Sequence, residues 1–146
     1  MPASTSSPAA PEGNAGRWTA RHEGMQVRGK GVAALPTSVR YITEAQCVGD
    51  STPDFWQALG FQRHYELLKD GLQFVVAHND FLLQVNLAVL KRLPEWGAVD
   101  KAAPLTTDHW LLEVTARAIE GEHVDASNAI GSLGELLLPL AELKRP

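Results

Sequence analysis

The residues from Phe81 to Lys91 limit the possible folds of this 146-residue chain more than any other segment. Every odd-numbered position from Phe81 to Val89 is apolar, whereas the polar residues Gln84 and Asn86 occupy even positions. A repeat of two residues places successive side chains on opposite faces of a β-strand, so this pattern predicts a strand with one buried face. We expect Gln84 and Asn86 to be much more exposed than the apolar set. That set is Phe81, Leu83, Val85, Leu87 and Val89.

A two-residue turn precedes this strand. Asn79 and Asp80 tolerate the left-handed backbone that tight hairpin turns require, so residues 72–78 are predicted to pair with the strand in an antiparallel hairpin. The dipeptide Asp70-Gly71 leaves two interpretations open. It is either another tight turn or a glycine bulge inside one long, bent strand from His64 to His78.

Other strands and two helices are predicted around this hairpin. Alternating patterns indicate strands at 17–22, 38–48 and 110–118, and two prolines mark 93–107 as a loop. The order strand, strand, helix, three strands, helix indicates an α+β fold that is predominantly antiparallel β. Sequential antiparallel strands of this kind form a curled meander, so we expect the sheet to make the wall of a β-barrel.

The two helices have recognisable ends. For the first, residues 53–59, Thr52 is the predicted cap, Pro53 suits the first helical position and Gly60 ends the helix. The second helix, residues 126–143, is weakened by Gly131 and Gly134, and Pro139 is expected to kink it or end its regular part. Its apolar face consists of Ile130, Leu133, Leu137 and Leu140.

Composition narrows the classes of function. A net charge of −4 gives no indication of a nucleic-acid-binding face, and a single cysteine, Cys47, excludes an internal disulfide. No apolar run reaches membrane-spanning length, and the N-terminus lacks the apolar region of a secretory signal, so we expect an intracellular protein. Residues 1–16 are rich in Ala, Ser, Pro and Gly and are expected to be disordered, or to reflect a misplaced reading-frame start. The domain is expected to span 17–146.

The residues give little indication of catalysis. The five histidines lack metal-ligand spacing, the Arg28–Gly31 loop lacks the full phosphate-binding pattern, and Cys47 has no base beside it in sequence. Glu66 and Glu113 could bind a metal or share a proton if both pointed into a barrel. Polyphosphate-processing tunnel enzymes, however, use a Glu-x-Glu pattern that this chain lacks. We therefore expect no catalytic residue, cofactor or metal, with a triphosphate-tunnel enzyme as the alternative.

The segment Asp54-Phe55, then Leu59-Gly60-Phe61, then Glu66-Leu67-Leu68-Lys69 and Gly71, resembles subunit 18 of the Mediator complex of RNA polymerase II, and is most similar to its plant and green-algal forms. The likeness runs from about Trp18 to the C-terminus, where residues 136–143 resemble the closing helix of the family. The residues that match the family at structural positions are Phe55, Leu59, Gly60, Phe61, Glu66, Gly71 and Pro139.

The resemblance implies a protein-binding barrel without catalysis, working in the nucleus in the regulation of RNA polymerase II transcription. It implies the partners subunit 20, a related barrel, and a C-terminal helix of subunit 8, within the Mediator head module. Contact with RNA polymerase II would be indirect, with no direct binding of nucleic acid or membrane. Family members carry a further strand and helix region ahead of the position of Trp18, so the barrel of this chain is expected to be incomplete, with unpaired strand edges.

Overall fold

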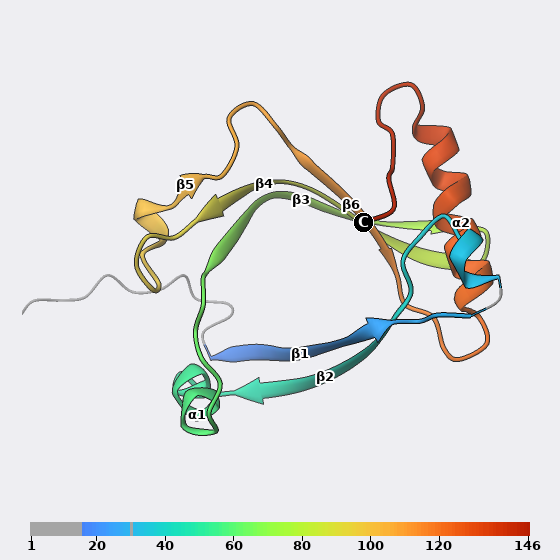
Figure 1. Cartoon of the computed structure of the whole chain (residues 1–146). Helices are drawn as coiled ribbons and strands as arrows, with labels where there is room; N and C mark the ends of the chain where they lie inside the picture. Colours follow the sequence, from blue (N-terminus) through green and yellow to red (C-terminus); the bar gives the residue numbers. More distant parts are fainter. Residues whose placement is uncertain (1–15, 30) are drawn as a thin grey trace, which may run out of the picture. The chain divides into compact units, whose positions relative to one another are not determined.

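The computed structural model of this chain describes residues 16–29 and 31–146. The tail expected at residues 1–16 lies outside the described residues, apart from Gly16. The structure consists mostly of antiparallel strands with two α-helices, which confirms the α+β class (Figure 1). The elements in chain order are β1 (Arg17–Gln26), η1 (Val32–Ala34), β2 (Arg40–Val48), α1 (Thr52–Ala58), β3 (Leu67–His78), β4 (Phe81–Arg92), η2 (Val99–Lys101), β5 (Ala103–Pro104), β6 (Leu111–Ala116) and α2 (His123–Leu137).

The strands form two separate sheets, and these sheets do not close into a barrel. β1 pairs with β2, whereas β3, β4, β5 and β6 make a four-stranded sheet in which β4 is central. The chain also divides into two compact units. The first holds the described residues up to Gly24 together with Ile42–Arg63, and the second holds Met25–Tyr41 and His64–Pro146.

In the first unit, polar pairs join β1 and β2. Arg21 lies 2.8 Å from Glu44 through both its Nε and Nη2 atoms, and Thr19 Oγ1 donates to Gln46 at 3.2 Å. Glu44 and Gln46 therefore project from the same face of β2, as the alternation predicted. The apolar residues Ile42 and Val48 are exposed, so this two-stranded sheet has little core of its own.

Helix α1 begins one residue earlier than predicted. Ser51 is the residue before the helix, and the prediction that Thr52 caps it is wrong, because Thr52 is already helical and its hydroxyl donates to the carbonyl of Gly49 at 2.8 Å. Pro53 consequently occupies the second helical position. The N–H groups of the first helical turn have no acceptor within the helix, so the missing N–H of proline costs no hydrogen bond there. Gly60 follows the helix with φ of 97°, a backbone conformation that confirms the predicted reason for glycine there.

The β3–β4 hairpin has the predicted turn and register. Asn79 and Asp80 have φ of 47° and 65°, and His78 faces Phe81 across the turn. Pairing then continues without interruption to Leu67 opposite Arg92. On its other side, β4 pairs with β6 and, at Lys91 and Arg92, with β5. The predicted loop at 93–107 thus contains a short strand as well as the 3-10 helix η2.

The predictions for Gly71 and for the start of β3 are wrong. Asp70, Gly71 and Leu72 face Val89, Ala88 and Leu87 one to one, so there is neither a bulge nor a turn. A Cβ atom on Gly71 would lie 2.6 Å from the Cα of Ala88, which is far inside van der Waals contact. Glycine is required here for close approach of two backbones. The strand begins at Leu67, so His64 and Glu66 precede it.

The burial pattern predicted for β4 is only partly right. Leu83 is completely buried while its neighbour Leu82 is 69% exposed, which agrees with the alternation. Gln84 and Asn86, however, are half-buried, as Val85 and Leu87 are, so the expected contrast between them is wrong. The reason is the central position of β4, because side chains of β3 and β6 flank it on both faces.

Helix α2 buries small residues against its surroundings. Ala126, Ser127 and Ala129 are buried, and the helix packs on β4 and β6. It begins three residues earlier than predicted and ends at Leu137, two residues before Pro139. Of the two effects predicted for Pro139, a kink or the end of the regular helix, the structure shows the end. Residues 138–143, which the prediction placed in this helix, are not helical.

The segment before β2 lies against α2. Thr37 Oγ1 and Ser127 Oγ are 2.6 Å apart, and a Cβ on Gly131 would meet Pro36 Cγ at 2.8 Å. Near the C-terminus, Arg145 Nη1 donates to the carbonyl of Ala33 at 2.9 Å. Gly131 was interpreted from sequence as a weak point of the helix, but in the structure it makes room for Pro36.

We therefore expect Gly131→Ala to destabilise the protein by about 1 kcal/mol, although glycine to alanine in a helix interior usually stabilises by a similar amount. The added methyl group must displace Pro36. Urea denaturation measures the difference in free energy of unfolding. In a Pro36→Ala background the same substitution should become neutral or stabilising, and an unchanged cost there would contradict this explanation.

Candidate protein-interaction surface

The register of the four-stranded sheet assigns its side chains to two faces. Residues that face each other across paired strands project to the same side, and alternate residues project to the opposite side. One side is apolar over most of its length and is called the apolar face below. It consists of Leu72, Phe74 and Val76 from β3, Leu83, Val85 and Leu87 from β4, and Leu112, Val114 and Ala116 from β6.

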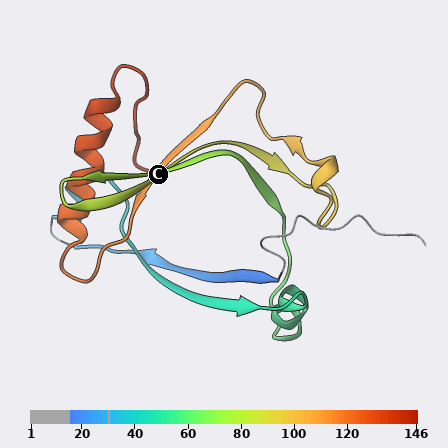
Figure 2. The same cartoon turned by 180° about the vertical axis from the view of Figure 1, so that it is seen from behind.

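Helix α2 covers only the end of the apolar face near the Asn79–Asp80 turn. Figures 1 and 2 both show α2 crossing this end of the hairpin, and His78 Nε2 lies 3.1 Å from Ser132 Oγ of the helix. Leu83 is fully buried there. Farther along β3, Phe74 is 49% exposed and Leu72 is 59% exposed. Part of an apolar sheet face is thus open to solvent, which makes it a candidate surface for binding a partner.

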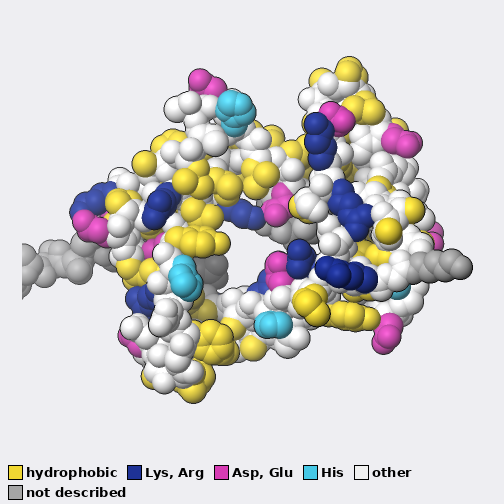
Figure 3. Space-filling view, in the orientation of Figure 1, with side chains coloured by type: hydrophobic (Ala, Val, Ile, Leu, Met, Phe, Trp, Pro, Cys, Tyr) yellow, Lys and Arg dark blue, Asp and Glu magenta, His cyan; other side chains and the backbone are white. Residues whose placement is uncertain are grey.

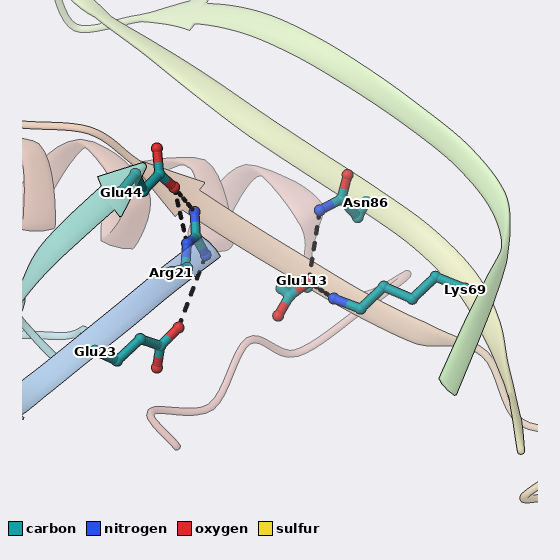
Figure 4. A network of polar contacts seen from close by, with 6 residues as sticks. All are labelled: Arg21, Glu23, Glu44, Lys69, Asn86 and Glu113. Atoms are coloured by element: carbon teal, nitrogen blue, oxygen red, sulfur yellow. Dashed lines mark hydrogen bonds and ion pairs between the residues drawn. The ribbon is translucent and has the colours of Figure 1, made fainter. Parts of the chain in front are cut away.

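The opposite side of the sheet carries a chain of polar contacts. Lys69 Nζ donates to Glu113 Oε2 at 2.7 Å, and Asn86 Nδ2 donates to the same oxygen at 3.5 Å (Figure 4). Gln84 Nε2 donates in turn to Asn86 Oδ1 at 3.4 Å. Glu113 is therefore a paired, half-buried carboxylate. Because Lys69 is half exposed, the ion pair contributes little to stability, on the order of 1 kcal/mol or less.

Glu66 has a structural partner outside β3. Its Oε2 accepts a hydrogen bond of 2.8 Å from the backbone N–H of Gly97, which joins the segment before β3 to the loop after β4. The prediction that Glu66 lies on a strand is wrong, because the strand begins at Leu67. Among residues 16–29 and 31–146, no group of three or more His, Cys, Asp or Glu side chains is placed to hold a metal ion.

A second group of exposed apolar residues surrounds α1. The Trp56 ring packs edge-on against Phe55 and Phe61, with ring centroids 5.7 Å and 5.1 Å apart. Phe55, Leu59 and Phe61 are all exposed, and Figure 3 shows hydrophobic side chains gathered at this place. The rings of Phe55, Trp56 and Phe61 thus pack on one another. Gly60 forms the turn between Leu59 and Phe61.

The remaining residues singled out from sequence are dispersed. Cys47 is half-buried and is a free thiol, and His109 Nδ1 contacts the carbonyl of Thr107 at 2.6 Å. Lys30 of the candidate phosphate loop lies outside the described residues. In the part of the chain that the structure describes, no helix is long and apolar enough to cross a membrane.

The sequence did not indicate that part of the apolar face is exposed. Alternation shows which residues share a face of a strand, but it does not show which other elements cover that face.

Comparison with known proteins identifies a relative of this chain. No family model matches the chain. Over 129 residues, 88% of its length, the chain is 30% identical to a protein of Arabidopsis thaliana named Mediator of RNA polymerase II transcription subunit 18. The chain is a homologue of Mediator subunit 18. It spans 58% of the length of that relative, and the aligned stretch is longer than either compact unit, so the homology includes residues of both.

Proposed function

We propose that this chain is a non-catalytic subunit of the Mediator coactivator complex and acts in the nucleus in the regulation of RNA polymerase II transcription. The match to Mediator subunit 18 over most of the chain supports this role. Its contribution would be protein–protein contacts within the head module, with RNA polymerase II contacted indirectly and with no direct binding of nucleic acid or membrane.

The observation that carries the proposal is the exposed part of the apolar face. Leu72 and Phe74 lie on the same face as the residues that α2 covers, so this surface continues beyond the helix. The five strand residues from Leu72 to Val76 span about 13 Å, and a helix with its side chains is about 10 Å wide. A partner helix that packs on the exposed Leu72 and Phe74 would therefore lie directly beside α2. A C-terminal helix of subunit 8 would lie here, and subunit 20 would associate with the same chain.

Co-expression with subunit 20 and the subunit 8 helix tests the proposal. We expect the three chains to co-purify and the melting temperature of this chain to rise, because partners that bind only the folded state stabilise it by about 2.7 kcal/mol at a hundredfold excess over Kd. Leu72→Asp should abolish retention of the subunit 8 helix. Leu82→Asp is the matched control, since Leu82 is similarly exposed but projects from the opposite face. A chain that remains unaffected by both partners would contradict the proposal.

The alternative function is a triphosphate-tunnel enzyme, and the contacts on the polar side of the sheet argue against it. Such an enzyme holds its metal with several carboxylates, whereas the Glu113 carboxylate is engaged by Lys69 and Asn86 and the Glu66 carboxylate by Gly97. We expect no hydrolysis of tripolyphosphate or nucleoside triphosphates with magnesium or manganese. The measurement is phosphate release. Turnover that is lost in Glu66→Gln, with an unchanged circular dichroism spectrum, would favour the enzyme instead.

A further inference from the structure

The chain between β1 and β2 is held in place by two other parts of the same compact unit. Residues 31–39, called the connection segment below, contribute two buried side chains, Val32 and Leu35, each 8% exposed. A segment with a single 3-10 turn is too short to bury side chains by itself, so contacts with other elements must cover them. One such element is α2, where Ser127 Oγ lies 2.6 Å from Thr37 Oγ1.

The residues after α2 are the other element. Residues 138–146, called the C-terminal latch below, begin with a turn in which the Ala141 N–H donates to the carbonyl of Leu137 at 3.1 Å. The chain then runs back beside α2, as Figures 1 and 2 both show. Leu143 is half-buried there, and its Cδ1 would lie 3.3 Å from a Cβ atom on Gly134. The latch thus packs on the backbone of α2 at a glycine.

Arg145 fastens the latch to the connection segment. Its Nη1 atom donates to the carbonyls of Ala33, at 2.9 Å, and Leu35, at 3.3 Å, both at the C-terminal end of η1. The last carbonyls of a helical turn have no N–H partner within it, and a guanidinium with several N–H donors can satisfy two of them at once. Next to Arg145, the backbone oxygen of Pro146 accepts a hydrogen bond of 3.1 Å from Ser38 Oγ.

We propose that the C-terminal latch and the connection segment form one unit that opens and closes on α2 while the four-stranded sheet stays folded, with Arg145 as the residue that fastens it. Residues 144–146 are exposed, so little apolar burial keeps the latch closed. Segments with few buried contacts open locally at a small fraction of the free energy of global unfolding. Opening would uncover the side of α2 that carries Ser127, Gly131 and Gly134, which follow one another at helical spacing.

Such a unit couples two parts of the chain that lie about a hundred residues apart. The connection segment leads directly into β2, which begins at Arg40. A molecule that binds only the open latch would therefore release the segment that leads into β2. Conversely, anything that holds the connection segment on α2 would keep the latch closed, because coupling between two sites is reciprocal. The latch is a conformational device that is separate from the apolar face of the sheet.

Hydrogen exchange of the full chain tests the latch without any Mediator subunit, so its result does not depend on the proposed function. The amides of Ala34 and Leu35 are hydrogen-bonded within η1 and report whether the connection segment is closed. Arg145→Ala should raise their exchange rates by roughly tenfold and leave those of the β3–β4 pairing unchanged. Lys144→Ala is the matched control, because Lys144 pairs with Glu142 within the latch and should affect neither set.

Three results would overturn the inference. These are unchanged exchange at Ala34 and Leu35 in Arg145→Ala, an equal increase throughout the sheet, or the same increase in the Lys144→Ala control.

A change at the far end of the connection segment tests whether the two parts open together. Thr37→Val keeps the shape of the side chain but removes the hydroxyl that contacts Ser127. Trypsin cleavage after Lys144, followed by mass spectrometry, reports opening of the latch, because proteases cleave the transiently opened state. We expect this cleavage to become severalfold faster in Thr37→Val and to stay unchanged in Thr19→Val, which removes a hydroxyl from β1. Unchanged cleavage in Thr37→Val would show that the two parts open separately and would overturn the inference.

Discussion

Leu83→Ala is expected to lower the free energy of unfolding by about 2–5 kcal/mol. Leu83 is the largest side chain that is completely buried among the described residues, and it lies where α2 packs on the sheet. Its truncation removes apolar contacts and leaves a cavity that the rigid strand cannot close. Urea denaturation followed by circular dichroism measures the loss.

The adjacent residue provides the control. Leu82 belongs to the same strand, has the same chemistry and is 69% exposed, so Leu82→Ala should change stability by no more than about 0.5 kcal/mol. The comparison holds strand propensity constant and varies only burial. Equal costs at the two positions would mean that β4 is shifted by one residue, which would move its whole buried set to the other face.

Gly71→Ala is the second substitution with a large expected effect, a loss of about 1–3 kcal/mol or more. The new methyl group would meet the backbone of Ala88, and a central strand cannot move aside as a flexible side chain can. Thermal denaturation should show a lower melting temperature, together with loss of amide protection along the β3–β4 pairing.

Gly29→Ala is the matched control for this effect. Gly29 also lacks a positive φ, but its added Cβ would only approach Val32 Cγ2 at an ordinary 3.9 Å. We expect it to be neutral or slightly stabilising, since alanine reduces the freedom of the unfolded chain. If Gly71→Ala proved as harmless as this control, the two strands would have to be farther apart than the structure shows.

Local signals in the sequence predicted much of this fold. Asn79-Asp80 between two apolar runs fixes a hairpin because both residues accept positive φ, and a two-residue turn then determines the register of β3 and β4. The strands β1, β2 and β6 and the helix α2 were predicted for similar reasons, and their ends differ by a few residues. Each of these signals depends only on residues close together along the chain.

The errors at Gly71, Gly131 and Asn86 concern residues whose roles depend on distant parts of the chain. Gly71 was interpreted as part of a tight turn or as a bulge, but the backbone that it accommodates lies in β4. Gly131 was interpreted as a defect in a helix, but it accommodates Pro36, almost a hundred residues earlier. Asn86 is half-buried because β6 lies beside β4, where the Asn86 amide contacts Glu113. Spacing along the sequence contains no information on such partners.

The surface that supports the proposed function was the least predictable part. The alternation placed Leu87 and Leu83 on one face, yet α2 reaches only the end that contains Leu83. Whether a sheet face is covered depends on the length of the helix that packs on it and on the place at which the chain brings that helix back to the sheet. Neither follows from hydrophobic periodicity. The family likeness of Phe55, Leu59 and Phe61 likewise did not indicate that these side chains are exposed.

The tight turn at Asn79–Asp80 also bears on the order in which the sheet can assemble. The entropy lost on closing a loop grows with its length, so contacts across a two-residue turn cost least, and pairing of β3 with β4 can propagate residue by residue from His78 and Phe81. β6 joins β4 only after the whole connection between them is closed, and α2 can pack only when both strands are in place. During synthesis and refolding, the hairpin therefore exposes the outer edge of β3 before any other part of the sheet is complete. A strand edge of this kind can pair with another chain, so the hairpin is open to intermolecular association until the rest of the sheet has formed.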